Sequence, residues 1–320
     1  ANNQIGTIAI GQSALSAITT GAGNTAVGYN SGQAIVGGSY NTIFGSGAGA
    51  VFNDEHHNTF IGYGTGGGDG SGGSCTAIGS NALSGAFTQD GTVAVGLSAL
   101  AALTSGAGNV AIGFEAGKAA TTGGANVYIG YGAGDETNSD ATANVGIGKN
   151  AFGGTHTGTV CHYNTAVGDN ALAGAMNGVD GATAFGYRGL FALTTGVGNT
   201  AIGYKAGEAL TTGARNLAIG YQAMDSLTQG DDNIGIGTDA LGSMAATDGN
   251  DQNIAIGSYA LANAGASSNV ASGNVAIGYS AGVQVTTADN TTAIGTSALA
   301  ALTTGSGNVA VGYGTLDDTD

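Results

Sequence analysis

The side chains best suited to chemistry in this chain are four histidines and two cysteines. His56 and His57 follow two acidic residues, and His156, Cys161 and His162 fall within one irregular stretch. Imidazole and thiolate groups are ligands for transition metals, but neither spacing matches a known metal-binding pattern. A solvated turn is the simpler interpretation of both groups, so we predict no resident metal.

Acidic residues gather in predicted turns, where carboxylates could bind calcium. The candidates are Asp135-Glu136, Asp231-Asp232, Asp248 with Asp251, and Gly67-Gly68-Asp69-Gly70. The last is similar to one turn of a glycine–aspartate calcium roll, but it does not recur. Calcium is therefore an alternative, and we predict no cofactor. No nucleophile, base and acid stand together in a catalytic pattern, so we do not expect an enzyme.

Charge and composition restrict the partners. The chain has 320 residues and a formal net charge of -16, with only five basic residues. Such a surface repels phosphate backbones and anionic lipid, so we expect no nucleic-acid partner. No apolar run approaches the ~20 residues that span a membrane. The acidic balance favours an extracellular location or a cell or virion surface, and the start at Ala1 indicates a processed protein or a fragment.

A repeat of about 17 residues must position all of these side chains. Its core is Asn-Thr-Ala-Ile-Gly, and the glycine recurs at Gly11, Gly28, Gly45, Gly62, Gly79, Gly96, Gly113, Gly130, Gly148, Gly168, Gly186, Gly203, Gly220, Gly237, Gly257, Gly278, Gly295 and Gly312. A unit this short cannot bury its own apolar face, so neighbouring units must stack. We predict an all-β parallel β-solenoid, or β-roll, of about 18 coils that forms one repeat domain over residues 1–320.

The residues before each repeat glycine predict a short strand. Ile, Val or Phe stands one residue before the glycine, and Thr, Val, Ile or Leu stands three before it. Alternate strand residues share a face, and we predict that these two form the inner wall. The alanine between them then faces outward, where a persistent small residue indicates packing against another chain. Ala201 and Ala218 are therefore candidate assembly residues, unless alanine is simply tolerated in a low-complexity repeat.

Three further positions have predicted roles. Asn stands four residues before the glycine in 13 of 18 coils, and we predict that it forms a turn and an amide ladder along the stack. The glycine itself marks a corner too tight for a Cβ atom. The second half of the coil fits either a helical turn or a second strand, and the strand is favoured because so short a helix lacks cohesion.

Tyrosine follows the repeat glycine in eight coils. Tyr187, Tyr204 and Tyr221 belong to consecutive coils and would stack as an exposed ladder. Aromatic columns recognise sugars or protein partners, and they also stabilise the stacking of strands. Both roles stay open, and the first makes this ladder a candidate binding surface for a host glycan or surface protein.

The two cysteines are too far apart to form a disulfide within one chain. Cys75 and Cys161 lie five coils apart, which is roughly 24 Å at about 4.8 Å per coil. A disulfide requires Cα atoms within about 7 Å. We predict two free thiols or an intermolecular bridge.

The repeat core resembles the head repeats of YadA-like trimeric autotransporter adhesins and related repeats of phage fibres. The matching segments are Asn164-Thr165-Ala166-Val167-Gly168 with Ala171, and Asn274-Val275-Ala276-Ile277-Gly278 with Ala281. The resemblance covers nearly all of the chain. It implies a left-handed parallel β-roll, side-by-side association of three chains and a head that binds host surfaces. The coil here is about three residues longer than that of the family.

The first and last coils carry the two open edges of the predicted sheet. Ile8 and Ile10 lie at one edge, and Val309 and Val311 lie at the other. Joining the ends would place 19 residues between Gly312 and Gly11, within the range of internal spacings, so end-to-end stacking could continue the solenoid. An excised piece of a longer repeat protein is the alternative.

We therefore predict an extracellular structural protein, a stiff rod that assembles with itself end to end into a filament. One alternative is the adhesive head or shaft of a surface or phage fibre that binds a host glycan or protein. Another is an ice-binding protein that presents its Thr-Thr pairs, such as Thr194-Thr195 and Thr211-Thr212.

Overall fold

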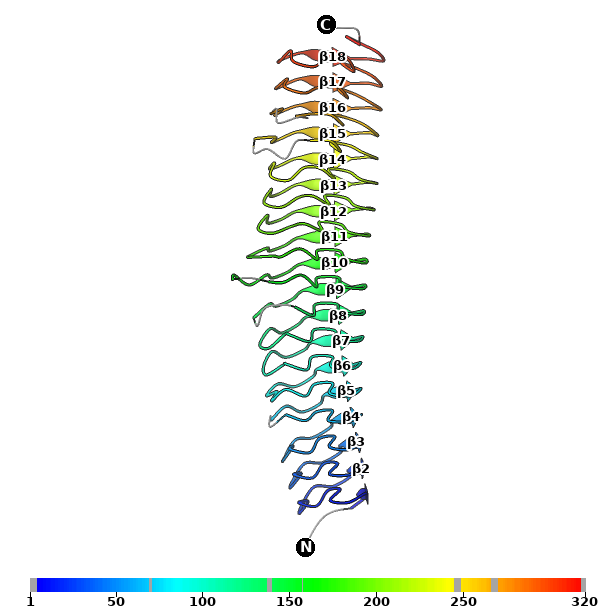
Figure 1. Ribbon diagram of the computed structural model, residues 1–320, viewed down its shortest axis with the longest axis vertical. Coiled ribbons are helices and arrows are strands. Elements are labelled where there is room, and N and C mark those ends of the chain that lie inside the picture. The colour runs from blue at the N-terminus through cyan, green and yellow to red at the C-terminus, as the bar shows by residue number, and fades with distance from the viewer. Residues whose placement is uncertain are drawn as a thin grey trace. The chain divides into compact units, whose positions relative to one another are not determined.

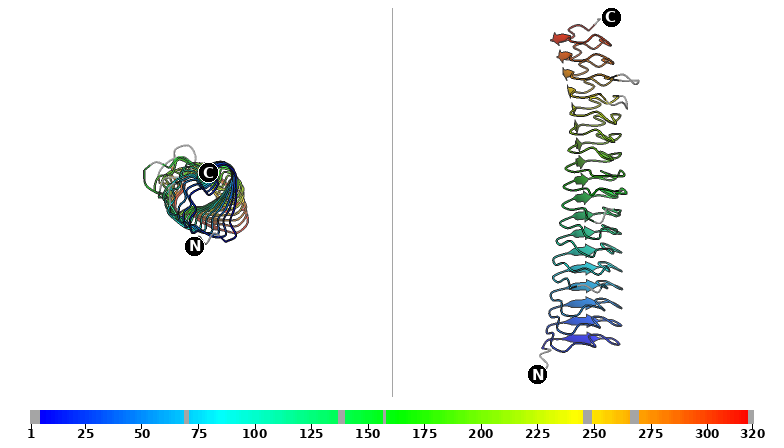
Figure 2. Two further views of the ribbon diagram at one scale, coloured as in Figure 1. Left: turned by 90° about the horizontal axis from the view of Figure 1, so that it is seen from below. Right: turned by 90° about the vertical axis from the view of Figure 1, so that its left-hand side faces the viewer.

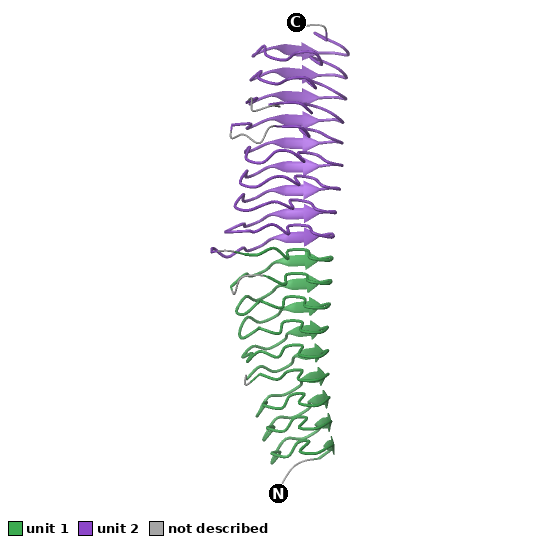
Figure 3. Cartoon of the chain, in the orientation of Figure 1, with its two compact units in different colours: residues 1–156 green, residues 157–320 purple. Residues whose placement is uncertain are grey.

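The computed structural model describes residues 5–68, 71–136, 140–156, 158–244, 249–265 and 270–317. The calcium candidates at Asp69-Gly70 and Asp248 lie outside these ranges. Contacts divide the chain into two compact units, residues 1–156 and residues 157–320 (Figure 3), and each is described by itself.

The described residues form eighteen parallel strands of three residues each, one per coil (Figure 1). Unit 1 contains β1 (Ile8–Ile10), β2 (Thr25–Val27), β3 (Thr42–Phe44), β4 (Thr59–Ile61), β5 (Thr76–Ile78), β6 (Val93–Val95), β7 (Val110–Ile112), β8 (Val127–Ile129) and β9 (Val145–Ile147). Unit 2 contains β10 (Thr165–Val167), β11 (Thr183–Phe185), β12 (Thr200–Ile202), β13 (Leu217–Ile219), β14 (Ile234–Ile236), β15 (Ile254–Ile256), β16 (Val275–Ile277), β17 (Thr292–Ile294) and β18 (Val309–Val311). The predicted parallel β-solenoid with a repeat of about 17 residues is confirmed. Among these described residues, no helix is long and apolar enough to cross a membrane.

Within each unit, neighbouring strands pair in strict register. In unit 2, Ala184 of β11 pairs with Ala201 of β12, which pairs with Ala218 of β13. Each position of the repeat therefore forms a column along the stack, and Figure 2 shows the strands lying one above another. The repeat supplies this register because every coil presents the same residue types at the same place.

The inward and outward faces of the strands are the reverse of the prediction. The middle residue of each internal strand is buried, while the residues on either side are half-buried or exposed. The inner wall is therefore made of alanine, and Ile, Val and Thr face outward. The reason lies in the second half of the coil, where leucines such as Leu190 and Leu193 point inward and fill the interior. Little more than a methyl group fits opposite them.

Side-chain volume is balanced across the interior of each coil. Phe60 occupies the usual alanine position, and a Cβ atom added at Gly66 of the same coil would lie 2.8 Å from its ring. Tyr128 has the same relation to Gly134, at 2.5 Å. Protein interiors pack without spare volume, so a large residue on the strand is accommodated by a glycine in the turn.

The second half of the coil consists of turns, and the favoured second strand is wrong. Left-handed residues alternate with right-handed ones, as at Lys205 (φ 57°) and Gly207 (φ 59°). The Lys205 amide donates to Tyr187 O of the preceding coil at 2.8 Å, and the Gly207 amide donates to Ala223 O of the following coil at 2.9 Å. Hydrogen bonds to both neighbouring coils therefore offset the cost of left-handed backbone.

The repeat glycine is required at its corner, as predicted. Gly203 has φ +136°, and a Cβ atom there would lie 2.3 Å from the carbonyl oxygen of Gly220 in the next coil. Only glycine tolerates both the dihedral angle and the close approach of the neighbouring backbone.

Candidate functional site

An uncharged strip runs along the outer face of the strands in each unit. Its two columns are the first and third residues of β1 to β18, which are Val, Ile, Leu, Phe or Thr throughout. Ile202 is 42% exposed and Phe185 is 53% exposed. Nine coils at about 4.8 Å, with columns about 6.6 Å apart, give a flat area on the order of 300 Å² per unit. The largest apolar patch on a typical monomeric protein has about this size and is often functional, so the strip is a candidate interaction surface. We call this surface the outer strip.

Ala201 and Ala218 do not belong to any surface. Their relative exposures are 0% and 2%, so the proposal that an outward alanine column mediates assembly is wrong. The residues that sequence reasoning placed inside, such as Ile202 and Ile219, occupy the surface instead. The inward leucines of the turns were the available signal, because they leave no room for two further branched side chains.

The four predicted end-contact residues belong to the outer strip. Ile8 and Ile10 are 52% and 59% exposed, and Val309 and Val311 are 67% and 64% exposed. Their side chains point away from the interior, as those of the other strands do. Contact between the ends through these residues stays a prediction.

The comparisons with known proteins give no family. No protein-family model matches the chain, and no curated protein is similar to it. Any function proposed for the chain therefore rests on the outer strip and the side-chain geometry. The likeness to adhesin heads stays a prediction.

The predicted tyrosine ladder is present in unit 2. Tyr187 and Tyr204 stack with ring centroids 5.2 Å apart and an interplanar angle of 17°, and Tyr204 and Tyr221 stack at 5.2 Å and 7°. The inner faces of the stack are therefore covered, including both faces of Tyr204, and one face each of Tyr187 and Tyr221 points away from the stack. This arrangement supports a stacking role; its role as a binding surface stays a prediction.

Two basic residues beside the ladder share one carboxylate. Glu208 lies 2.5 Å from Arg188 and 3.1 Å from Lys205. Arg188 also lies over the ring of Phe191, 3.8 Å from its centroid. These pairs are partly exposed and contribute little stability each, but they hold long side chains along the turn.

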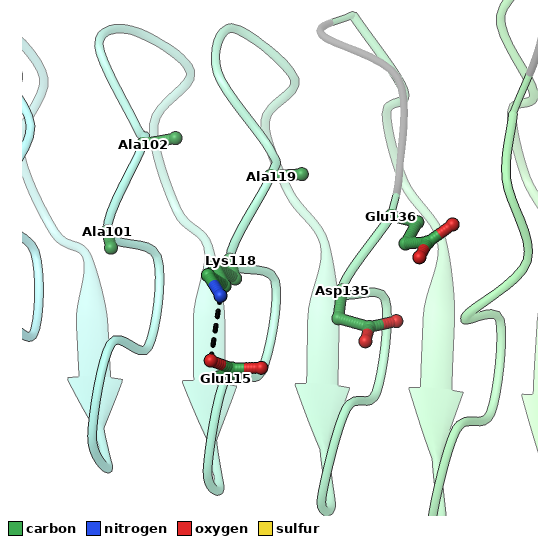
Figure 4. Close-up of a pocket in the computed structure, with 7 residues that line it drawn as sticks. All are labelled: Ala101, Ala102, Glu115, Lys118, Ala119, Asp135 and Glu136. Carbon is green, nitrogen blue, oxygen red and sulfur yellow. Dashed lines mark hydrogen bonds and ion pairs between the residues drawn. The ribbon is translucent and has the colours of Figure 1, made fainter.

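A shallow acidic groove lies on unit 1 between neighbouring coils (Figure 4). Glu115 pairs with Lys118 at 2.7 Å, and Asp135 and Glu136 project from the next coil. Burial, followed by repulsion from Glu136, raises the pKa of the Asp135 carboxyl. Alanines, including Ala101, Ala102 and Ala119, line the rest. The groove is one of the predicted calcium sites, and its one lysine is already paired with a groove carboxylate.

The other acidic candidates have structural partners. Arg215 binds Asp232 through Nε and Nη2 at 2.7 and 2.8 Å and reaches Asp231 at 3.2 Å. Asp231 Oδ1 also accepts the Ala214 amide at 2.8 Å, and Asp251 Oδ1 accepts the Asp231 amide at 2.8 Å. These carboxylates bind backbone amides of neighbouring coils, which accounts for aspartate in these turns. In the described ranges, no group of three or more His, Cys, Asp or Glu is arranged to hold a metal ion.

The histidine pair at residues 56 and 57 also has local partners. His56 Nδ1 accepts the Ser39 amide at 2.9 Å, and His57 stacks on Tyr40 with centroids 5.3 Å apart. Both cysteines are buried, and no disulfide joins them within the chain, as predicted. Burial raises the pKa of the Cys75 and Cys161 thiols, which opposes thiol reactivity. The choice between reduced thiols and an intermolecular bridge stays a prediction.

The threonine pairs use hydroxyl groups for cross-coil bonds. Thr194 Oγ1 donates to Thr211 O at 2.9 Å, and Thr211 Oγ1 donates to Thr228 O at 2.9 Å. One hydroxyl of each of these pairs is thus used within the fold. Ice binding stays a prediction.

His156 is buried without hydrogen-bond partners. It is 6% exposed, packs edge-on against Phe152 at 4.8 Å, and neither ring nitrogen has a partner within the described residues. Burial lowers its pKa from 6.5 to about 4. The charged form is therefore disfavoured in the folded state.

Unit 1 is expected to lose stability in mild acid because of His156. As pH falls below 6.5, His156 becomes protonated in the unfolded chain. In the folded chain it stays neutral until about pH 4. The free energy of unfolding should fall by about 2 kcal/mol between pH 7 and pH 5. Urea titrations of wild type and His156→Phe measure this difference. The exposed-site variant His57→Phe is the control and should keep the acid loss; an unchanged loss in His156→Phe contradicts the assignment.

Proposed function

We propose that the protein is a structural β-solenoid that associates side by side with copies of itself through the outer strip. The proposal rests on the outer strip, whose residues in every coil of both units are uncharged, either apolar or threonine, and half-buried or exposed. A chain with a net charge of -16 repels its copies over most of its surface. Association through this uncharged strip avoids that repulsion.

The repeat favours a second copy over an unrelated partner. Strand spacing is set by backbone hydrogen bonding at about 4.8 Å, so two identical solenoids share the period of their side-chain ridges. Ridges of Ile and Val on one strip can then enter the grooves of the other over many coils. A partner without this period would match only locally. The resemblance to trimeric adhesin heads supports the same mode, and we keep the extracellular or surface location as part of the proposal.

Charge on the outer strip should separate the copies. We expect the double variant Ile202→Lys, Ile219→Lys to run as a monomer where the wild type forms an oligomer, because two ammonium groups would be buried unpaired. The mass in solution is measured by light scattering and analytical ultracentrifugation. Raising the salt concentration should strengthen wild-type association, because it screens the repulsion between acidic chains.

The matched control is Thr195→Lys, an exposed turn residue away from the strip, which should leave the oligomer intact. A monomeric wild type at high protein concentration would overturn the proposal. Electron microscopy distinguishes the mode of assembly. Bundles or trimers that disappear in the double variant support lateral contact, whereas filaments that persist in it support end-to-end stacking.

A further inference from the structure

One rung is missing from an aromatic column of unit 1. Tyr29 and Tyr63 follow the repeat glycines of coils that are two apart, and the coil between them carries Ser46 at that position. Where rings occupy consecutive coils, they stack with centroids 5.0 to 5.2 Å apart. Omitting one ring leaves about 10 Å between its neighbours. The gap therefore has room for one inserted ring, about 5 Å from each tyrosine, as in the protein's own stacks.

The tyrosine faces at this gap are free, unlike those of the ladder in unit 2. Tyr29 is 54% exposed and Tyr63 is 66% exposed, and neither ring contacts another aromatic ring in the described part of the chain. Ser46 and Gly47 form the floor, and a Cβ atom added at Gly47 would meet nothing within 4 Å. We call this recess the tyrosine slot.

Backbone hydrogen bonds fix the spacing of the coils that carry the two tyrosines. The Gly47 amide donates to Tyr29 O at 2.8 Å, and the Gly64 amide donates to Ser46 O at 3.1 Å. Binding therefore need not order the backbone, and only the tyrosine side chains have to settle against the ligand.

The rim of the slot is polar and uncharged. Asn30 and Asn81 place amides beside the two tyrosines, and Ser84 lies further along the same side. None of the described residues that line the slot is charged. A ligand that fits has apolar faces for the two rings and hydroxyl groups around its edge for amides and phenols. A pyranose ring has this chemistry, since its axial C–H bonds form flat faces and its equatorial hydroxyls radiate from the edge.

We propose that the tyrosine slot binds a neutral pyranose unit of a polysaccharide between Tyr29 and Tyr63. The net charge of -16 disfavours acidic sugars. The inference is independent of lateral association, because the slot lies in the turns and the outer strip lies on the strands.

The decisive variant is Ser46→Tyr, which supplies the missing rung. The third ring should stack between Tyr29 and Tyr63, keep the fold and close the slot. The probes are cellohexaose, mannohexaose and chitohexaose, tested with the full chain by saturation-transfer NMR and by titration of tyrosine resonances. We expect at least one to bind the wild type, and we expect Ser46→Tyr and Tyr63→Ala each to weaken it by about tenfold or more.

Tyr131→Ala is the control, because Tyr131 occupies the same repeat position outside the tyrosine slot and stacks on Phe114 with ring centroids 5.0 Å apart; it should leave sugar binding unchanged. Thermal unfolding of Ser46→Tyr at or above the wild-type temperature shows that the fold is retained. Failure of all three probes at millimolar concentration overturns the proposal, as does sugar binding that survives Ser46→Tyr. If N-acetyl-tyrosinamide binds in their place and Ser46→Tyr abolishes it, the slot receives an aromatic side chain of a protein partner and the sugar assignment is wrong.

Discussion

Replacing Gly96 with alanine is expected to destabilise unit 1 by about 4 to 6 kcal/mol. Gly96 has φ +137°, and a Cβ atom there would lie 2.1 Å from Gly113 O and 2.6 Å from its carbonyl carbon. These are backbone atoms of the next coil, which is itself held by the coil beyond it. The clash cannot be relieved by rotating a side chain, so either the corner opens or hydrogen bonding between the two coils is lost.

The same coil provides the matched control. Gly91 has φ +71°, and an added Cβ would meet nothing within 4 Å. Gly91→Ala should therefore cost only the left-handed strain, about 1 kcal/mol. Urea unfolding followed by circular dichroism compares both variants with wild type. Similar losses for the two alanine variants would show that the approach of the next coil adds little to the cost at Gly96.

The second large effect is expected at the buried asparagine ladder, where Asn216→Ala should cost unit 2 about 4 kcal/mol. Asn216 Nδ2 donates to Gly230 O at 2.7 Å, and its Oδ1 accepts the Asn233 amide at 2.9 Å and Asn233 Nδ2 at 3.1 Å. Truncation removes the partner of the buried Gly230 carbonyl and of the buried Asn233 amide, while Asn233 Nδ2 keeps its bond to Asn250 O at 2.8 Å. Native-state hydrogen exchange of the Asn233 amide should report the loss directly.

Asn308→Ala is the control for the ladder. Asn308 is half-buried, and Asn308 Nδ2 donates to Gly305 O at 2.8 Å, so its removal should cost about 1 kcal/mol. A second comparison is Asn216→Thr, since Thr291 occupies the equivalent position and donates to Asn274 Oδ1 at 2.6 Å. An Asn216→Ala loss no larger than that of Asn308→Ala would mean that the cross-coil amide bonds contribute little.

The repeat predicted the stack, the corner glycines and the amide ladder, but not the direction of the strand faces. Alternation in Thr200-Ala201-Ile202 shows which side chains share a face, and hydrophobicity alone then places Ile inside. The interior volume decides otherwise, and that volume is filled from the turn by Leu190 and Leu193. Which strand residues face inward therefore depends on the second half of the coil. The sequence left the structure of that half open between a helical turn and a second strand.

The turns were missed because leucine rarely adopts left-handed backbone. Leu83, Leu100 and Leu172 do so, with φ between 48° and 50°. Local propensity opposes this conformation, and hydrogen bonds between coils outweigh it. The available signal was that the same position alternates between leucine and glycine, as at Leu190 and Gly207. A position that accepts glycine so often indicates unusual backbone.

The tyrosine slot was missed for a related reason. The continuous column from Tyr187 to Tyr221 is evident in the sequence, whereas the position between Tyr29 and Tyr63 carries no ring to draw attention to it. Exposed ring faces arise from the gap at Ser46, which becomes visible only when residues 17 apart are read as neighbours. The ladder itself was predictable, because identical positions in consecutive coils must stack.

The volume balance inside the coils also bears on how such a chain reaches its native alignment. Coils that are nearly interchangeable invite slippage, in which a segment docks one repeat out of place and keeps most of its hydrogen bonds. The oversized residues oppose this error. A Cβ atom added at Gly117 of the preceding coil would lie 2.9 Å from the ring of Tyr128, and one added at Gly146 of the following coil would lie 3.3 Å from it. A coil that docks one repeat out of place would press Tyr128 against Leu100 where Gly117 belongs, and would leave a void beside Gly146. The coils with oversized residues fit only one alignment of the stack. They therefore favour the native register during folding of an otherwise uniform repeat.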